Sequence, residues 1–556
     1  MVGSHNLTDY EAKREEFSWD EIYAEADRAA PRELNIGHEV ADRHATDRGK
    51  VALYQVGTDG ELTTMTFWEL ADRSSQFANL LEELGVEEGE RVFSYMPRIP
   101  EHYVAMVGTL KRGAVWGSVN ERFGPDGISY RLDDCDTKVV VTTSDNRETV
   151  AEALKSVPSV EHVITVDRGS GAPPEDVVFN TALDDASTEY EAADTSADDD
   201  AMLYYTSGTT GLAKGVLHKQ RWVAGVAATQ KYAVDLQPGD IYWSTGDLGW
   251  LTGAINTLGA WFWGASLFTY EGEFDPEEWA DLLDQYPITV LFSVPTAYRM
   301  LRENEEVLDD ADLDLRHALS IGEPLSASVV EWGQDNLGVT ILDTYGQTET
   351  GNMIINNYPT MELRPGSMGR PLPGIEAEIV DPDSGEVLEP GETGEIAQRG
   401  EYPCFFAEYW NKPEKTENCF VDGPDGEWYL SGDLAHKDED GYFWFEGRAD
   451  DVILSSGYRI GPFEVESSLG EHEAVAESAV VPKPHRERGN IVKAFVVPSE
   501  DVEPSEGLKE EIKNHVKEEL SAHEYPREIE FREELPKTVT GKIRRNELRD
   551  EVDEEA

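Results

Sequence analysis

The run Tyr205-Thr206-Ser207-Gly208-Thr209-Thr210-Gly211-Leu212-Ala213-Lys214-Gly215 follows the apolar stretch Ala201-Met202-Leu203-Tyr204. This order predicts a strand that ends in a loop of small side chains. Hydroxyl groups and unobstructed backbone N–H groups can surround phosphate oxygens, and glycine allows the close approach and positive φ that this requires. The loop therefore predicts phosphate binding, with an ordinary hairpin or turn as the alternative for any cluster of Gly, Ser and Thr.

The loop does not match a Walker-type P-loop, G-x-x-x-x-G-K-[ST]. Counted from Gly208, the sixth position holds Ala213 instead of glycine. Gly215 follows the lysine, where Ser or Thr would bind Mg²⁺. Another class of phosphate site is therefore indicated.

The chain has 556 residues, which is enough for two or more domains with sizeable cores. Its formal net charge is -65, from 112 acidic and 47 basic residues. This charge excludes nucleic acids and anionic membranes as partners, because both would be repelled. We interpret the acidity as a halophilic adaptation to a salty cytoplasm, where molar salt shortens the Debye length to about 3 Å. The alternative is an ordinary acidic protein, which self-repulsion at low salt disfavours.

The cysteines and the apolar segments indicate in which compartment the protein works and whether it enters a membrane. Cys135, Cys404 and Cys419 are too widely spaced for a zinc cluster or a disulfide framework, which predicts a reducing cytoplasm. Residues 1–17 are charged and lack the apolar region of a signal peptide. Residues 251–270 carry no charge over the length of a membrane span. Their asparagine, their glycines and their strand-like end favour a buried helix followed by a core strand, so we expect no membrane insertion.

Short β-rich apolar runs alternate with amphipathic stretches along the chain. Residues 139–141, 288–292 and 339–342 are such runs, and residues 67–84 place apolar side chains at helical spacing. This alternation predicts an α/β fold with largely parallel sheets. The acidic, aromatic-poor stretch 184–200 is typical of a solvated linker.

A change in composition at Gly447-Arg448-Ala449-Asp450-Asp451 predicts a domain boundary at Asp450. Residues 1–449 then form one domain, and residues 450–556 suit a small α+β domain. The elements expected in the small domain are two strands and a charged helix, at 479–481, 494–497 and 508–520.

A second informative run, Asp343-Thr344-Tyr345-Gly346-Gln347-Thr348-Glu349-Thr350, follows another predicted strand. It suits a nucleotide, because the ring can stack on a base, threonine can bind phosphate and glutamate can hold Mg²⁺. A helix-capping sequence is the alternative. Further short motifs follow the same chain order: Gly322-Glu323-Pro324, Ser431-Gly432-Asp433, Gly447 to Asp451, Ser455 to Gly461, and Pro536-Lys537-Thr538-Val539-Thr540-Gly541-Lys542.

Together these motifs resemble the adenylate-forming (ANL) superfamily, and within it the AMP-forming acyl-CoA synthetases. The resemblance spans nearly the whole chain. It implies a large N-terminal domain of layered α/β/α sheets with a small β subdomain, and a small mobile α+β C-terminal domain. It also implies that ATP, a carboxylic acid and CoA give acyl-CoA, AMP and pyrophosphate through an acyl-adenylate, with Mg²⁺ required.

The resemblance also implies roles for particular residues. Tyr345 would stack on adenine and Asp433 would accept both ribose hydroxyls, as an acceptor-only group can. Thr348 would contact the α-phosphate and Glu349 would bind Mg²⁺. The full set implied for ATP or AMP is Thr206, Ser207, Gly208, Thr209, Thr210, Gly211, Lys214, Gly322, Glu323, Pro324, Asp343, Thr344, Tyr345, Gly346, Gln347, Asp433, Arg448 and Arg459.

Lys542 is implied as the catalytic lysine. An attacking carboxylate and the α-phosphate are both anionic, so a fixed ammonium would stabilise the in-line transition state. Family members then rotate the small domain about a hinge at the position of Asp450. Ser456 and Gly457 would lie against pantetheine, and Lys517 would contact the CoA phosphates, although a plain surface lysine explains Lys517 nearly as well.

The chain length of the acid stays open at this point. Relatives specific for acetate carry a tryptophan at the position of Gly346, and this tryptophan closes the floor of the acyl pocket. A glycine at this position implies a deeper pocket. Trp250, Leu251, Thr252 and Ile321 occupy the positions that line the acyl pocket in the family. One CH₂ changes binding by about 0.8 kcal/mol, so we expect a broad range from propionate to medium-chain fatty acids.

The alternatives within the superfamily are an acetyl-CoA synthetase and an aryl-CoA ligase of the benzoate type. From a different class, a non-catalytic nucleotide-binding protein would keep the ATP pocket without needing Lys542 or Glu349. Oligomeric state, pathway and regulation are not encoded in any motif that we recognise.

Overall fold

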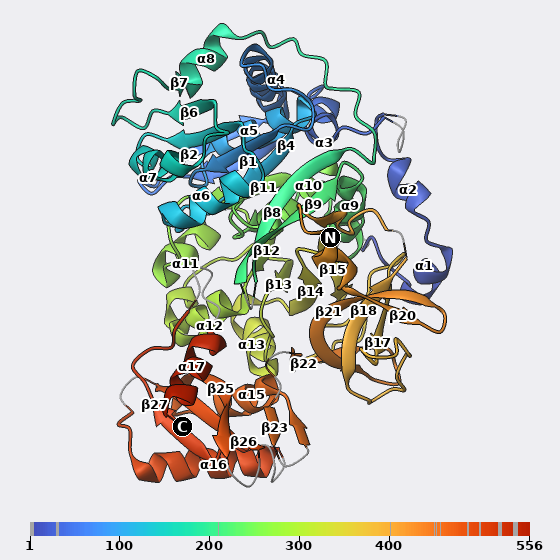
Figure 1. Cartoon of the computed structure of the whole chain (residues 1–556), viewed down its shortest axis with the longest axis vertical. Helices are drawn as coiled ribbons and strands as arrows, with labels where there is room; N and C mark the ends of the chain where they lie inside the picture. Colours follow the sequence, from blue (N-terminus) through green and yellow to red (C-terminus); the bar gives the residue numbers. More distant parts are fainter. Residues whose placement is uncertain are drawn as a thin grey trace.

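The computed structural model describes residues 5–28, 33–208, 211–400, 402–449, 451, 453–455, 458–485, 489–499, 502–520, 525–537 and 543–555. Figure 1 shows large sheets and their helices in the upper part of the view, with β17, β18, β20 and β21 beside them at the right. The residues from β23 onward form a separate unit at the bottom of the view (Figure 1). The expected α/β fold, with a large multi-sheet N-terminal part and a small C-terminal part, is confirmed.

The larger sheet is parallel in its centre and antiparallel at both ends. Its central strands are short apolar runs, and every residue of β12 is buried, as expected for a parallel sheet covered on both faces. Because β13 and β14 run parallel, the residues that follow them lie at the same edge of the sheet. In order across the sheet, the strands are β16 (Arg370–Pro371), β15 (Asn352–Asn356), β14 (Ile341–Gln347), β13 (His317–Ser320), β12 (Val290–Ser293), β10 (Ile241–Ser244), β11 (Ser266–Tyr270), β1 (Val51–Val56) and β2 (Leu62–Thr66).

The second sheet contains the quoted loop at one end. Its strands are parallel from β8 to β7, whereas β8, β9 and β19 pair antiparallel. The antiparallel end therefore brings β19, which comes from much later in the chain, beside the quoted loop. In order, the strands are β19 (Glu408–Tyr409), β9 (Gly211–Lys219), β8 (Asp200–Gly208), β4 (Val115–Ser118), β3 (Arg91–Tyr95), β5 (Val139–Thr143), β6 (His162–Val166) and β7 (Val177–Val178).

Two smaller sheets complete the fold. An antiparallel sheet consists of β17 (Glu376–Val380), β18 (Gly394–Arg399), β21 (Gly426–Lys437), β20 (Phe420–Gly423) and β22 (Phe443–Arg448). The C-terminal sheet consists of β24 (Tyr458–Ile460), β23 (Ile453–Ser455), β26 (Gly489–Pro498), β25 (Val475–His485) and β27 (Glu528–Phe531). The rings of Phe445 and Phe463 lie 5.8 Å apart between their centroids, which joins β22 to the first helix of the C-terminal unit.

The helices of the N-terminal part cover and separate the large sheets. One buried cluster includes side chains of both sheets, among them Trp116, Tyr204, Tyr242 and Phe292. The helices are α1 (Tyr10–Glu16), α2 (Trp19–Tyr23), α3 (Ile36–Val40), α4 (Phe67–Glu83), α5 (Pro100–Lys111), α6 (Pro125–Asp134), α7 (Arg147–Ala153), α8 (Phe179–Asp185), α9 (Trp222–Tyr232), α10 (Leu251–Phe262), α11 (Pro276–Gln285), α12 (Pro295–Glu303), α13 (Ala327–Trp332) and α14 (Pro413–Glu417). Short helical turns lie at η1 (Asp42–His44), η2 (Leu154–Ser156), η3 (Glu305–Leu308) and η4 (Gly333–Leu337).

The C-terminal unit contains α15 (Pro462–Gly470), α16 (Glu506–Glu519) and α17 (Arg545–Glu555). Its apolar interior includes Val480 and Val496 from the sheet and Ile512 and Val516 from α16. The strands and the charged helix expected from the sequence are thus present as β25, β26 and α16.

The uncharged stretch 251–270 is a buried helix, α10, followed by the core strand β11, as expected. The lack of charge follows from burial between the sheets. Among the described residues, no helix combines the length and the apolar character needed to cross a membrane.

The expected linker 184–200 differs from a free solvated segment. Ala193 N–H donates to the carbonyl of Lys111 at 2.9 Å, and Thr195 Oγ1 donates to the carbonyl of Leu34 at 2.7 Å. Ala192 and Ala197 are buried. Small side chains at these positions let the acidic segment lie against the protein while its carboxylates stay in water.

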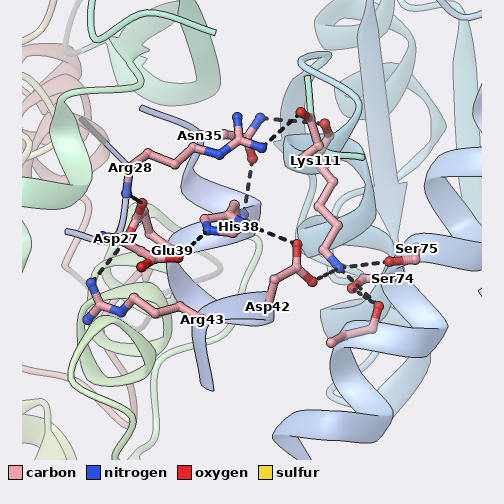
Figure 2. Close-up of polar contacts among 12 residues, drawn as sticks. Asp27, Arg28, Asn35, His38, Glu39, Asp42, Arg43, Ser74, Ser75 and Lys111 are labelled. Carbon is pink, nitrogen blue, oxygen red and sulfur yellow. Dashed lines mark hydrogen bonds and ion pairs between the residues drawn. The ribbon is translucent and has the colours of Figure 1, made fainter. Parts of the chain in front are cut away.

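A buried charged network ties α3, η1, α4 and α5 together (Figure 2). The Lys111 ammonium is fully buried and pairs with Asp42, and it also donates to Ser75 Oγ at 3.0 Å and to the Ala71 carbonyl at 2.9 Å. His38 lies between Asp42 and Asp27, at 3.4 Å and 3.1 Å from their carboxylate oxygens. Burial by itself would raise the pKa of Asp42, but His38 and Lys111 outweigh it and lower that pKa below 3.8.

Candidate functional site

The quoted loop is the tip of a β8–β9 hairpin. Thr206 stands opposite Lys214 in the register, and Gly208 stands opposite Gly211. Thr206 Oγ1 is buried and has no hydrogen-bond partner in the described part of the chain. An unpartnered buried hydroxyl is uncommon and suits a site that a ligand completes.

Lys214 and Glu349 meet at Tyr409. The Lys214 ammonium donates to the Tyr409 hydroxyl at 2.9 Å, and that hydroxyl donates to Glu349 Oε1 at 2.7 Å. The Lys214 Nζ and Glu349 Oε1 atoms are 3.8 Å apart. Two charged residues separated by 135 positions are thus held at one point by a side chain of β19.

A second polar cluster centres on Asp433, which is buried. Its Oδ2 accepts from the Tyr345 hydroxyl at 2.7 Å and from Gln347 Nε2 at 2.5 Å, and its Oδ1 pairs with Arg448 at 2.8 Å. Burial, and then the charge of Asp433, raises the pKa of Tyr345 well above 10, so its hydroxyl stays a neutral donor. The structure therefore brings together four of the residues implied for nucleotide binding.

Asp343 and Thr344 use their side chains within the fold. The Thr344 hydroxyl donates to the Ser320 carbonyl at 2.8 Å, which ties β14 to β13. Asp343 Oδ1 accepts from the Thr344 backbone N–H at 3.1 Å, and burial raises the pKa of Asp343 well above 3.8. The implied contacts of these two residues with ATP stay predictions.

The turn after β14 carries Thr348 and Glu349. Thr348 and Glu349 are half-buried, and the carbonyls of Gln347 and Thr348 both accept from the Gly351 N–H. Gly351 has φ 64°, and a Cβ there would collide with the Cys404 carbonyl. A glycine is needed at this position for the chain to turn.

The Gly322-Glu323-Pro324 loop follows β13 at the same edge as β14. Gly322 has φ 94°, a conformation that favours glycine. The Glu323 carboxylate accepts from Thr296 Oγ1 at 2.7 Å and from Arg299 at 2.7 Å. Its position is therefore set by α12, and Pro324 is half-buried beside it.

The residues implied for the acyl pocket lie at the start of α10 and just after β13. Trp250 is the N-cap of α10, its ring lies 5.9 Å from that of Phe123, and Leu251 is buried. Thr252 is half-buried and Ile321 is buried beyond the end of β13.

Gly346 lies tightly against the backbone of β15. A Cβ there would collide with the carbonyl oxygen of Asn352 and lie 3.1 Å from the Cα of Met353. Both are backbone atoms of β15, so a tryptophan would need β15 to move. Gly346 is thus required by close strand pairing in this structure, and its effect on chain length stays a prediction.

Several predicted residues lie outside the described residues: Thr209, Thr210, Asp450, Ser456, Gly457 and Lys542. For Ser207, Gly208, Gly211 and Arg459, only the backbone is described, within β8, β9 and β24. Lys517 is exposed on α16, with its ammonium 5.6 Å from the centre of the Tyr525 ring. Figure 1 shows α16 at the bottom of the C-terminal unit, away from β14, and the contact of Lys517 with CoA phosphates stays a prediction.

Three residues of the site were missed by the sequence reasoning. Tyr409 contacts both Lys214 and Glu349, Arg299 holds Glu323, and the Tyr429 hydroxyl donates to Gln347 Oε1 at 3.0 Å. Tyr409 belongs to a strand of two residues, and its pairing with β9 cannot be read from so short a run. No local signal marks the other two.

The surroundings of Glu349 fit a magnesium ion held mainly by a nucleotide. In the described part of the chain, Oε2 of Glu349 accepts no hydrogen bond, while Oε1 is bound by Tyr409. The described residues contain no group of three or more His, Cys, Asp or Glu side chains placed for a metal. Mg²⁺ commonly binds through one or two carboxylates together with substrate phosphates, and one carboxylate is what the site offers.

Comparison with known proteins agrees with this geometry. Residues 37–410 match the AMP-binding enzyme family, and residues 464–542 match the AMP-binding enzyme C-terminal domain. The acetyl-coenzyme A synthetase of Bacillus subtilis (strain 168) is 43% identical over 555 residues, which cover 99% of this chain and 96% of that protein. The mitochondrial acyl-coenzyme A synthetase ACSM4 of Homo sapiens is 38% identical over 540 residues, covering 94% and 91%.

Among solved structures, an anthranilate CoA ligase in complex with anthranoyl-AMP superposes with a TM-score of 0.86. It is 30% identical, and the match covers 97% of this chain and 99% of that chain. The family match exceeds half of the chain, and both relatives align over nearly their whole length. The chain therefore belongs to the AMP-binding enzyme family and is a ligase of the AMP-forming acyl-CoA synthetase class.

Proposed function

We propose that this enzyme activates short- to medium-chain fatty acids, from propionate upward, as acyl-adenylates and transfers the acyl group to CoA. Residues 1–449 would form the adenylation domain and residues 450–556 the mobile domain that supplies Lys542. The observation that carries the proposal is the meeting of Lys214, Tyr409 and Glu349 near the tip of the β8–β9 hairpin, where Lys214 stands opposite Thr206, whose buried hydroxyl has no partner among the described residues.

The proposed roles follow from the chemistry of each side chain. Lys214 and the hairpin hydroxyls would hold the β- and γ-phosphates that leave as pyrophosphate. Asp433 keeps acceptor capacity for ribose hydroxyls, because a carboxylate offers about four lone-pair positions and its three bound partners leave room. Mg²⁺, when bound at Glu349, would neutralise charge on the phosphates.

The substrate range is tested by carboxylate-dependent exchange of pyrophosphate into ATP, with AMP release in the presence of CoA as a second readout. We expect the highest kcat/KM for acids of three to about ten carbons, with neighbouring lengths differing only several-fold, since one CH₂ contributes about 0.8 kcal/mol. Acetate should be a weaker substrate. Activity with acetate alone would contradict the proposed range, and no exchange with any acid would contradict the adenylation proposal.

An aromatic acid is the second candidate substrate. The high structural likeness to an anthranilate CoA ligase favours it, because the motifs that bind ATP do not distinguish aliphatic from aromatic acids. Benzoate and anthranilate in the same panel separate the two, and a benzoate kcat/KM above that of every fatty acid would assign the enzyme to aryl substrates.

We also propose that the enzyme is adapted to a salty cytoplasm. The support is the formal net charge of -65, which destabilises a compact state unless salt screens it. The thermal midpoint should rise by several degrees between about 0.1 M and about 2 M KCl, measured by calorimetry. An unchanged midpoint over that range would contradict the proposal.

A further inference from the structure

Tyr409 occupies a position between two opposite charges of the site. Its hydroxyl accepts a hydrogen bond from Lys214 at 2.9 Å and donates one to Glu349 at 2.7 Å. The Lys214 ammonium also lies 4.0 Å from the centre of the Tyr409 ring, within the range of a cation–π contact. The phenol therefore contacts the ammonium through both its oxygen and its ring face.

The position of Tyr409 is fixed by the backbone on both sides. Tyr409 pairs with Val216 of β9, and the Trp410 N–H donates to the Gly215 carbonyl at 2.7 Å. The Phe406 N–H donates to the Glu349 carbonyl at 3.0 Å, so the segment before β19 is also bonded to the turn after β14. Tyr409 thus belongs to a short segment that connects the hairpin with the turn.

The side chain of Tyr409 is buried, with 2% of its surface exposed, against Phe406 and Tyr429. This burial holds the phenol in place, with its hydroxyl bonded to both Lys214 and Glu349.

Lys214 and Glu349 would attract each other directly without the phenol. Their charged atoms are 3.8 Å apart, at the limit of an ion pair, and their side chains are only 23% and 12% exposed. A direct pair would occupy the ammonium and the carboxylate with each other. The phenol instead satisfies one carboxylate oxygen and holds the ammonium with a neutral acceptor.

We propose that Tyr409 is a positioning residue that keeps Lys214 available for the phosphates of ATP and orients Glu349 so that its second oxygen can bind Mg²⁺. This inference rests on the proposed adenylation function. Tyr409 acts through its neighbours, and the hydroxyl, not the ring, carries the effect.

The test compares wild type, Tyr409→Phe and Tyr358→Phe. Phenylalanine keeps the buried ring at position 409 and removes only the hydroxyl. Tyr358 is the matched control, because it is also buried and its hydroxyl donates to the Pro371 carbonyl at 3.1 Å. Binding of adenosine 5′-(α,β-methylene)triphosphate, which cannot release pyrophosphate, is measured by calorimetry with Mg²⁺ and with EDTA.

Tyr409→Phe should weaken binding of the magnesium-nucleotide complex about tenfold, as expected when a hydrogen bond to a charged group is lost. Binding in EDTA should change less, because Glu349 is then not used by the metal. In the exchange assay, the Mg²⁺ concentration for half-maximal rate should rise, while thioester formation from supplied acyl-AMP and CoA stays unchanged. Tyr358→Phe should match wild type in all of these.

An equal loss with Mg²⁺ and with EDTA would overturn the inferred effect of Tyr409 on Glu349 and Mg²⁺. A loss shared by Tyr358→Phe would assign Tyr409 to packing alone and overturn the inference as a whole. Wild-type binding constants for Tyr409→Phe would overturn it as well. Failure of the proposed function gives a different pattern, because wild type would then show no exchange while the calorimetric comparison still decides the role of Tyr409.

Discussion

Lys542→Ala should lose about 100- to 1000-fold in acyl-adenylate formation and keep the conversion of supplied acyl-AMP and CoA to thioester. The adenylation step brings a carboxylate to the α-phosphate, and loss of one fixed charge-stabilising donor costs about 3–4 kcal/mol in such transition states. The thioester step has no such anion pair and does not need this ammonium. ATP–pyrophosphate exchange measures the first step, and thioester formation from synthetic acyl-AMP measures the second.

Lys537→Ala is the matched control, because it removes an ammonium from the same motif. Lys537 pairs with Glu477 at 2.9 Å and is 40% exposed, so it has a local structural role. Its backbone forms a bridge with Ile543, and Ile543 packs against a small apolar cluster of the C-terminal unit. We expect near wild-type rates in both steps for Lys537→Ala. Equal losses of both steps in Lys542→Ala would contradict the assignment of that residue.

Asp42→Asn should lower the free energy of unfolding by about 3 kcal/mol, measured by urea denaturation in high KCl at neutral pH. The Lys111 ammonium has no exposure to water, and Asp42 is its anionic partner (Figure 2). Removing one member of a buried pair leaves a charge without compensation, which costs about 3–5 kcal/mol. In the Asp42→Asn variant, Lys111 would still donate hydrogen bonds to Ser75 and to the Ala71 carbonyl. We therefore expect a loss of stability at the lower end of this range.

The stability that Asp42 contributes should be lost at low pH. The pKa of Asp42 is lowered below its ordinary 3.8, so its contribution is complete above that value and disappears as pH falls through the lowered pKa. The difference between Asp42→Asn and wild type should therefore shrink only in acid.

Two variants provide the controls for the Asp42 prediction. Glu152→Gln breaks the ion pair between Glu152 and Lys155. The two side chains are 58% and 69% exposed, respectively, and such exposed pairs contribute only about 0–1 kcal/mol to the free energy of unfolding. The double variant Asp42→Leu with Lys111→Met removes both charges and should recover most of the loss. A double variant as unstable as Asp42→Asn would show that the loss does not come from an unpaired buried charge.

Much of the fold follows from local patterns. The short β-rich apolar runs at 139–141, 288–292 and 339–342 overlap the strands β5, β12 and β14, and the uncharged stretch at 251–270 forms α10 and β11. The acidic stretch 184–200 was harder, because its composition indicates solvent while its small alanines and its backbone bonds hold it to the protein.

The sequence by itself determined the class of this protein, since the hydroxyl-rich loop, the motif from Asp343 to Thr350 and their order along the chain are local features that short segments carry. Only the tertiary structure decided that Tyr409 joins Lys214 to Glu349, and that β15 lies against Gly346. The physical reason is that these contacts depend on which distant strands pair and in what register. A strand of two residues or a glycine carries no pattern from which such a pairing can be inferred.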